Sequence, residues 1–251
     1  MPTRLMAFDL DDTLAPSKSP LPERMAGLIV RLLERIPVGI ISGGQFSQFR
    51  TQVIDRLDAP AAVLENLYLM PVTGTRYYRF ADGEWHEQYS EDLTPEQRRA
   101  ALDALEEVAK GLGYWESDTY GPVLEDRGSQ ITFSAFGQAA PPDIKAAWDP
   151  TDEKKNRLRE AVQAKLPGLS VRSGGSTSID ITREGIDKAY GMRKLVEVTG
   201  IPLDDMLFVG DRLDPHGNDY PVKAMGARTH AVRGWEDTAD YLERLLADGL
   251  V

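Results

Sequence analysis

Hydrophobic positions near the start of the chain alternate between two kinds of pattern. Short apolar runs with the length of buried strands occur at residues 5–8, 38–41 and 62–64. Longer segments that place apolar side chains three and four positions apart, as amphipathic helices do, occur at residues 22–36 and 45–57. Parallel strands joined through helices of this length form right-handed βαβ units. The chain is therefore predicted to open with a Rossmann-like α/β fold built on a parallel sheet.

The alternation stops near residue 82. Strand-like runs are predicted at residues 76–80, 130–136, 169–172 and 177–182. Two helices are predicted, at residues 95–112 and 152–166, and the sequence Thr94-Pro95-Glu96-Gln97 has the features of a capping box with proline at the first helical position. Strands grouped with two helices, without regular βαβ alternation, indicate a separate α+β module.

From residue 185 the first pattern returns. Two helices are predicted at residues 187–199 and 235–246, and two strands at residues 206–209 and 228–232. We therefore predict an α/β catalytic core over residues 1–81 and 186–251, interrupted by an inserted α+β cap over residues 82–185 that determines substrate specificity.

Composition narrows the classes of function. Hydrophobic residues make up 41% of the chain, so a packed core is feasible, and the formal net charge is −11, which argues against nonspecific binding to nucleic acid or to an anionic membrane. No apolar run approaches the roughly 20 residues of a membrane helix. The chain contains no cysteine and its first residues lack the apolar segment of a signal peptide, so we expect a cytoplasmic protein.

Three carboxylates follow the first apolar run, in the sequence Asp9-Leu10-Asp11-Asp12-Thr13. Unpaired carboxylates are strongly disfavoured at the end of a buried strand. Because side chains two apart on a strand point the same way, Asp9 and Asp11 are expected to face one point, where a hard cation such as Mg²⁺ would relieve their repulsion. Strand-end caps and a calcium-binding loop are the alternatives. An EF-hand loop requires an oxygen ligand and then glycine where this chain has Thr13 and Leu14.

Polar residues also end two other predicted strands. Ser42 follows residues 38–41, and Asp211 follows residues 206–209 with Gly210 between. Open parallel sheets bind ligands at the carboxyl ends of their strands, so these residues should converge on Asp9. Taken singly, Ser42 is equally well explained as a helix cap, Asp211 as a turn residue, and Lys188 as a solvated helix residue.

At this point the chain resembles the haloacid-dehalogenase superfamily of phosphotransferases. Four sequence motifs carry the resemblance, at residues 9–14 (DLDDTL), 40–44 (IISGG), 185–188 (GIDK) and 209–219 (VGDRLDPHGND). Their spacing fits the type IIB arrangement, with a large cap between the second and third motifs. Within that type the chain is most similar to the eukaryotic-type α-phosphomannomutases, through residues 127–137, 149–157, 174–180 and 210–219.

The resemblance implies a role for each motif residue. Asp9 would be the nucleophile that forms an aspartyl phosphate, and Asp11 the general acid and base. Other residues would bind the transferring phosphoryl group, namely Thr13, Ser42, Gly43 and Lys188. Mg²⁺ would be held by Asp9, the backbone carbonyl of Asp11 and Asp211, with Asn218 or Asp219 orienting ligands.

In the cap, the resemblance implies that Ser178 and Asp180 bind sugar hydroxyls and that Arg127 binds a distal phosphate; a solvated sheet face is an equal alternative. The mutases bind this phosphate with several arginines, and at three of those positions this chain has Lys18, Gln138 and Lys145. A neutral glutamine loses the bidentate grip of arginine on phosphate. Ser42-Gly43-Gly44 is also closer to the phosphatases of the superfamily.

The first hypothesis is therefore an Mg²⁺-dependent phosphatase acting on a small phosphate ester, with a sugar phosphate as the expected substrate. A phosphomannomutase-like phosphohexomutase is the alternative, and a catalytically silent sugar-phosphate-binding protein is a third hypothesis. The mutase resemblance also implies a homodimer formed through the cap.

Overall fold

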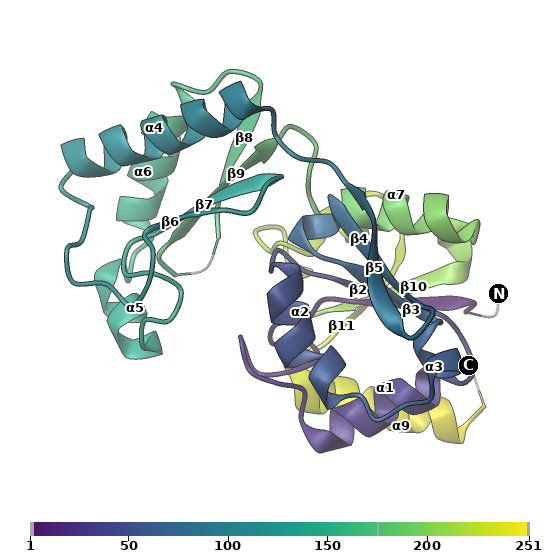
Figure 1. Cartoon of the computed structure of the whole chain (residues 1–251). Coiled ribbons are helices and arrows are strands. Elements are labelled where there is room, and N and C mark those ends of the chain that lie inside the picture. The colour runs from purple at the N-terminus through teal and green to yellow at the C-terminus, as the bar shows by residue number, and fades with distance from the viewer. Residues whose placement is uncertain (1–2, 175, 250–251) are drawn as a thin grey trace. The chain divides into compact units, whose positions relative to one another are not determined.

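The computed structural model describes residues 3–174 and 176–249. The chain divides into two compact units, one formed by Met1–Ser90 with Asp187–Val251 and the other by Glu91–Ile186 (Figure 1). The second unit is thus inserted into the first, as the sequence pattern predicts.

The first unit is built on a seven-stranded sheet with the order β11-β10-β1-β2-β3-β4-β5. Its strands are β1 (Leu5–Phe8), β2 (Val38–Ile41), β3 (Leu67–Met70), β4 (Arg76–Ala81), β5 (Glu84–Ser90), β10 (Met206–Gly210) and β11 (Arg228–Ala231). The five strands from β11 to β3 are parallel, whereas β4 and β5 extend the sheet antiparallel. This confirms the predicted α/β class.

Helices cover both faces of this sheet. The α-helices are α1 (Glu23–Leu33), α2 (Phe46–Gln52), α3 (Ala61–Leu64), α7 (Lys188–Thr199), α8 (Tyr220–Ala224) and α9 (Trp235–Ala247). Alternate residues of β1 face opposite cores, so that Met6 and Phe8 pack with residues of α1 and α9, whereas Leu5 and Ala7 pack with residues of α7. Figure 1 shows α1 and α9 together on one side of the sheet and α7 on the other. This three-layer arrangement explains why the central strands are apolar throughout.

The second unit has a four-stranded antiparallel sheet with the order β6-β7-β9-β8. Its strands are β6 (Leu124–Asp126), β7 (Gln130–Ser134), β8 (Leu169–Ser173) and β9 (Ser178–Arg183), and its helices are α4 (Pro95–Gly111), α5 (Pro142–Trp148) and α6 (Glu153–Gln163). Side chains such as Ile131 and Ile179 join those of α4 and α6 in one core. Thr94 and Gln97 form the predicted capping box at the start of α4.

Two predictions about the elements are wrong. Residues 62–64 lie in the short helix α3, and the third strand of the sheet is Leu67–Met70. A three-residue apolar run has no periodicity that separates a strand from one helical turn. The predicted boundary at residue 82 falls inside the β4–β5 hairpin, because β5 pairs with β4 in the first sheet, and the units divide after Ser90 and after Ile186.

Within the described residues, no helix combines the length and the apolar character needed to cross a membrane.

Candidate active site

Three neighbouring strands of the first sheet end in polar residues. Asp9 follows β1, Asp211 follows β10 and Ser42 follows β2, and β1 lies between the other two strands in the sheet. Because the three strands are parallel, their carboxyl ends meet at one edge. The convergence expected from the sequence is therefore built into the strand order.

Lys188 is the cation of this edge. Its Nζ atom lies 2.6 Å from Asp9 Oδ1 and 2.5 Å from Asp219 Oδ1. The lysine and Asp9 are each only 4% exposed, and Asp219 is fully buried. The alternative that Lys188 is a solvated helix residue is therefore wrong.

The local structure of α7 brings Lys188 to this position. Asp187 caps the helix, its side chain accepting a hydrogen bond from the Tyr190 backbone N–H at 3.0 Å. One turn on, Gly191 allows a close approach, since a Cβ atom there would lie 2.8 Å from Ile41 Cγ2. Gly74, with φ of +86°, faces Gly191 so closely that its Cβ would lie 2.6 Å from the Gly191 Cα. The start of α7 is thereby packed against the end of β2.

Burial sets the electrostatics of the cluster. Burial raises the pKa of Asp9 to about 8, against the lowering effect of the Lys188 charge, and the carboxylate of Asp219 adds to the rise. Burial also raises the pKa of Asp211, again with Asp219 contributing. Burial by itself would lower the pKa of Lys188, but Asp9 and Asp219 outweigh it and hold that pKa above its ordinary value. The cluster has an excess of negative charge that one ammonium group does not neutralise.

The residues present fit a hard divalent cation. Carboxylate oxygens of Asp9, Asp211 and Asp219 all lie within 4.8 Å of one another, the only such group among the described residues. The Asp211 backbone N–H donates to Thr13 Oγ1 at 3.1 Å, and that hydroxyl lies 3.2 Å from Asp211 Oδ1. The backbone N–H of Arg212 donates to Asp219 Oδ2 at 3.0 Å. An all-oxygen set of this kind suits Mg²⁺. Asn218, by contrast, is exposed.

Asp11 differs from the prediction. Strand β1 ends at Phe8, so Asp9 and Asp11 do not share a strand face, and the Asp11 carboxylate is not part of the Asp9 group. Instead it accepts hydrogen bonds from the Lys18 backbone N–H at 2.6 Å, from Gln48 Nε2 at 3.1 Å and from Gln52 Nε2 at 3.3 Å. The two carboxylates therefore have different partners.

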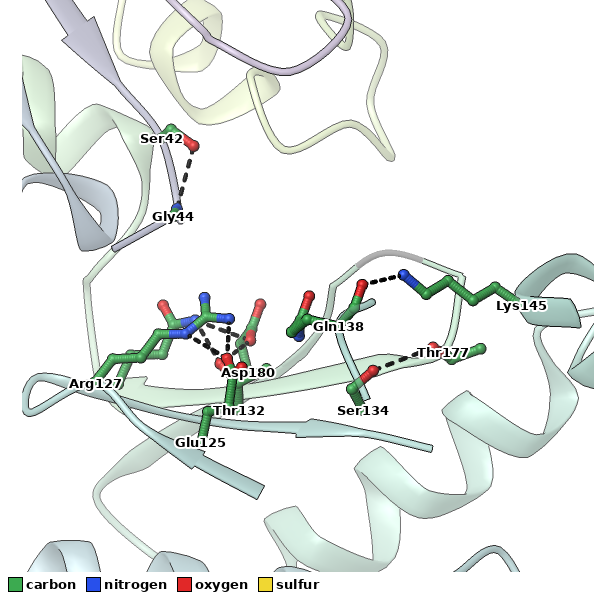
Figure 2. A network of polar contacts seen from close by, with 11 residues as sticks. Ser42, Gly44, Glu125, Arg127, Thr132, Ser134, Gln138, Lys145, Thr177 and Asp180 are labelled. Carbon is green, nitrogen blue, oxygen red and sulfur yellow. Dashed lines mark hydrogen bonds and ion pairs between the residues drawn. The ribbon is translucent and has the colours of Figure 1, made fainter. Parts of the chain in front are cut away.

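Ser42 does not cap a helix. Its hydroxyl accepts a hydrogen bond from the Gly44 backbone N–H at 3.2 Å (Figure 2). Helix α2 begins further on, at Phe46, with Gln45 as its N-cap. Gly43 lies between them in the same turn, and the Ser42 carbonyl accepts from the Thr73 N–H at 2.9 Å. The end of β2 therefore carries a buried serine side chain followed by the backbone of two glycines.

In the second unit, the predicted substrate residues lie in polar networks (Figure 2). Asp180 Oδ1 accepts from Thr132 Oγ1 at 2.8 Å and from Gln130 Nε2 at 2.9 Å. Arg127 is paired with Glu125, with 2.6 Å between Arg127 Nη2 and Glu125 Oε2.

Two further predicted residues of this unit are Lys145 and Ser178. Lys145 Nζ donates to the backbone carbonyl of Gln138 at 2.7 Å, and Ser178 is half-buried at the start of β9. Ser178 and Asp180 are both half-buried, so the face that they share on β9 is only partly solvated.

The sequence did not reveal the residues that bind the side chains of Asp11, Arg127 and Asp180. These residues are Gln48, Gln52, Glu125, Gln130 and Thr132. Two of these had a usable signal: Gln48 and Gln52 are four apart on a predicted helix and therefore share one of its faces. Glu125 had a weaker signal, since an acidic residue lies only two positions before Arg127.

Comparison with known proteins agrees with this architecture. The chain is 26% identical over 257 residues to a probable phosphomannomutase of Caenorhabditis elegans, a match that covers 97% of this chain and 96% of the relative. An IMP-bound IMP-nucleotidase of Plasmodium falciparum has a similar fold, with a TM-score of 0.69 and 16% identity over 98% of this chain and 68% of that one. A haloacid dehalogenase-like hydrolase of Bacteroides thetaiotaomicron also has a similar fold, with a TM-score of 0.61 and 16% identity. That match covers 97% of this chain and 99% of the hydrolase.

These structural likenesses, at such low identity, establish the fold alone. The family model described as eukaryotic phosphomannomutase matches residues 25–248, which include all of the second unit and most of the first. The chain belongs to the eukaryotic phosphomannomutase family.

Proposed function

We propose that this protein is an Mg²⁺-dependent phosphohexomutase that moves a phosphoryl group between positions of a hexose phosphate, with mannose phosphate as the substrate to test first. The observation that carries the proposal is the family match over residues 25–248, since it includes the inserted unit and the three motifs at residues 40–44, 185–188 and 209–219. The first motif, at residues 9–14, precedes the matched range. The sequence alone favoured a phosphatase, whereas the family match favours a mutase.

In this mechanism an Asp9 carboxylate oxygen attacks phosphorus, and the bond from phosphorus to the leaving oxygen breaks. Asp11 gives its proton to that oxygen. In the second half-reaction a sugar hydroxyl loses its proton to Asp11 and attacks the aspartyl phosphate, which returns the Asp9 carboxylate.

Asp9, Asp211, Asp219 and the Asp11 carbonyl would hold Mg²⁺, which supplies positive charge against the repulsion between Asp9 and the anionic phosphoryl group. Lys188 lies against Asp9 and would neutralise charge on the transferring oxygens. Ser42, Gly43 and Thr13 would bind or position the same oxygens.

In the inserted unit, Ser178 and Asp180 would bind sugar hydroxyls, and Arg127 and Lys145 would bind the distal phosphate. This division would make the first unit the catalytic core and the second the specificity cap.

Hydrolysis is the second candidate, and the Glu125–Arg127 ion pair favours it. The two side chains are only 20% and 11% exposed, so a distal phosphate must compete with a nearby carboxylate for the guanidinium group. A mutase must retain a sugar bisphosphate between its half-reactions. The neutral side chain of Gln138 offers no positive charge to hold that bisphosphate. Weak retention would allow water to accept the phosphoryl group.

One assay separates the candidates. Mannose 1-phosphate is supplied with Mg²⁺, with and without a hexose 1,6-bisphosphate, and mannose 6-phosphate and free phosphate are both measured. Bisphosphate-dependent formation of the 6-phosphate with little free phosphate supports the mutase. Free phosphate as the main product supports the hydrolase. No turnover of these or of other phosphate esters would leave the third hypothesis, a silent sugar-phosphate-binding protein.

A further inference from the structure

The two carboxylates of the first motif are held by chemically different groups. Asp9 lies against the ammonium of Lys188, whereas the Asp11 side chain accepts from the neutral amides of Gln48 and Gln52 and from a backbone N–H. Each amide nitrogen donates to one oxygen of the Asp11 carboxylate, so the two glutamines together orient it.

The amide orientations are fixed by their other partners. Gln48 Nε2 also donates to Gln52 Oε1 at 2.7 Å, and Gln52 Nε2 also donates to the Ser19 carbonyl at 2.8 Å. Gln52 is 3% exposed, so its amide has little freedom to turn. Both amide nitrogens therefore point toward the Asp11 carboxylate. Gln48 donates a hydrogen bond to Oδ2 and Gln52 donates one to Oδ1.

Gly44 leaves the space that the Gln48 amide occupies. A Cβ atom at position 44 would lie 2.2 Å from Gln48 Oε1 and 2.6 Å from its Cδ, well inside contact distance. Gly44 belongs to the segment after β2, and Gln48 lies on α2, so the second motif and the helix that follows it act together on Asp11.

We propose that Gln48, supported by Gln52 and by the absence of a side chain at Gly44, is a positioning residue for the Asp11 general acid and base. The inference rests on the proposed function and adds to it a device by which the second motif controls the first. Gln48 itself is not required to touch the substrate.

The test compares leaving groups. Gln48→Met keeps the length of the side chain and removes the donor, while Gln48→Lys restores a donor. For Gln48→Met, kcat with a hexose phosphate should fall about 10- to 100-fold, part of the factor that a positioned acid supplies. With 4-nitrophenyl phosphate, whose leaving group needs no proton, the fall should be under about threefold. Gly44→Ala should give the same pattern, and Gln48→Lys should recover most of the loss.

A double-mutant cycle with Asp11→Asn decides whether the effect passes through Asp11. In that background Gln48→Met should have no further effect on turnover of the hexose phosphate. An equal loss on both substrates, or a loss that persists in Asp11→Asn, would overturn the inference while leaving the proposed function intact. A wild-type enzyme that transfers phosphate from no ester would instead overturn the proposed function and this inference with it.

Discussion

The Nζ atom of Lys188 lies 2.6 Å from Asp9 Oδ1, although the whole inserted unit separates the two residues in the sequence. The same ammonium group contacts Asp219, so that one cation serves two buried carboxylates. Removing it would leave those carboxylates buried and without their shared counter-charge, which is more costly than losing a surface ion pair.

Lys188→Met is therefore expected to reduce turnover of any phosphate ester by about 10²–10³-fold, the range found when one preorganised charge donor is lost. It should also lower the free energy of unfolding by about 3–5 kcal/mol. Turnover and urea unfolding are measured on the same preparations. Lys194→Met is the matched control, since Lys194 is on the same helix and pairs with Glu197 outside the site. Equal losses in both variants would contradict the role of Lys188.

The raised pKa of Asp9 predicts a specific dependence of stability on pH. An unfolded chain releases this proton near pH 3.8, whereas the folded, metal-free protein keeps it until about pH 8. Folded protein thus binds more protons over that window, so the contribution of Asp9 to the unfolding free energy falls as pH rises from about 4 to 8.

Asp9→Asn should remove this contribution. In metal-free buffer the variant is expected to gain stability relative to wild type between pH 5 and pH 8, as measured by urea unfolding. Adding Mg²⁺ at pH 8 should stabilise wild type more than the variant, because the cation favours the ionised carboxylate. Parallel stability profiles for the two proteins would refute the assignment. The variant should also form no phosphorylated protein detectable by intact mass.

The contact of Thr13 with Asp211 predicts an effect on metal affinity. Thr13→Val keeps the shape of a fully buried side chain but removes the hydroxyl that bonds Asp211. We expect Mg²⁺ to bind about 10- to 100-fold more weakly, the usual effect of losing a partner of a metal ligand. Thr13→Ser retains the hydroxyl and serves as the control. Calorimetric titration with Mg²⁺ measures both, and unchanged affinity in Thr13→Val would count against the Asp9, Asp211 and Asp219 site.

The close packing of Gly191 predicts a loss of both stability and activity. A methyl group there meets Ile41 Cγ2, so Gly191→Ala should lower the unfolding free energy by about 1–3 kcal/mol and displace the start of α7 that carries Lys188. Gly27→Ala, in the helix α1 with no atom within 4 Å of the new Cβ, should instead gain about 0.5–1 kcal/mol. Thermal unfolding and ester turnover test both; a neutral Gly191→Ala would show that α7 has room to move.

The Glu125–Arg127 pair predicts a change in the fate of the phosphoryl group. Glu125→Gln should release Arg127 for a distal phosphate and raise the ratio of mannose 6-phosphate to free phosphate roughly fivefold, the factor that about 1 kcal/mol produces. Glu107→Gln is the control, because Glu107 pairs with Lys165 on an exposed surface of the same unit. If both variants leave the product ratio unchanged, Arg127 does not bind the distal phosphate.

Local pattern predicted most of the elements because hydrophobic periodicity and capping residues act over a few positions. The apolar runs at β1, β2 and β10 and the capping box at Thr94 are found where they were expected. The pattern failed at residues 62–64, where a single helical turn and a strand have the same composition, and at β5, whose half-exposed residues have no apolar alternation.

The sequence by itself determined that three carboxylates follow a buried strand, that a lysine opens a later helix, and that an inserted module interrupts an α/β sheet. Only the tertiary structure decided that Lys188 contacts Asp9 and Asp219, that Asp11 is bound by Gln48 and Gln52, and that Arg127 faces Glu125. The physical reason is range. Strand order, helix packing and side-chain direction bring together groups that are distant along the chain, and the choice among polar partners depends on burial and geometry that no local pattern encodes.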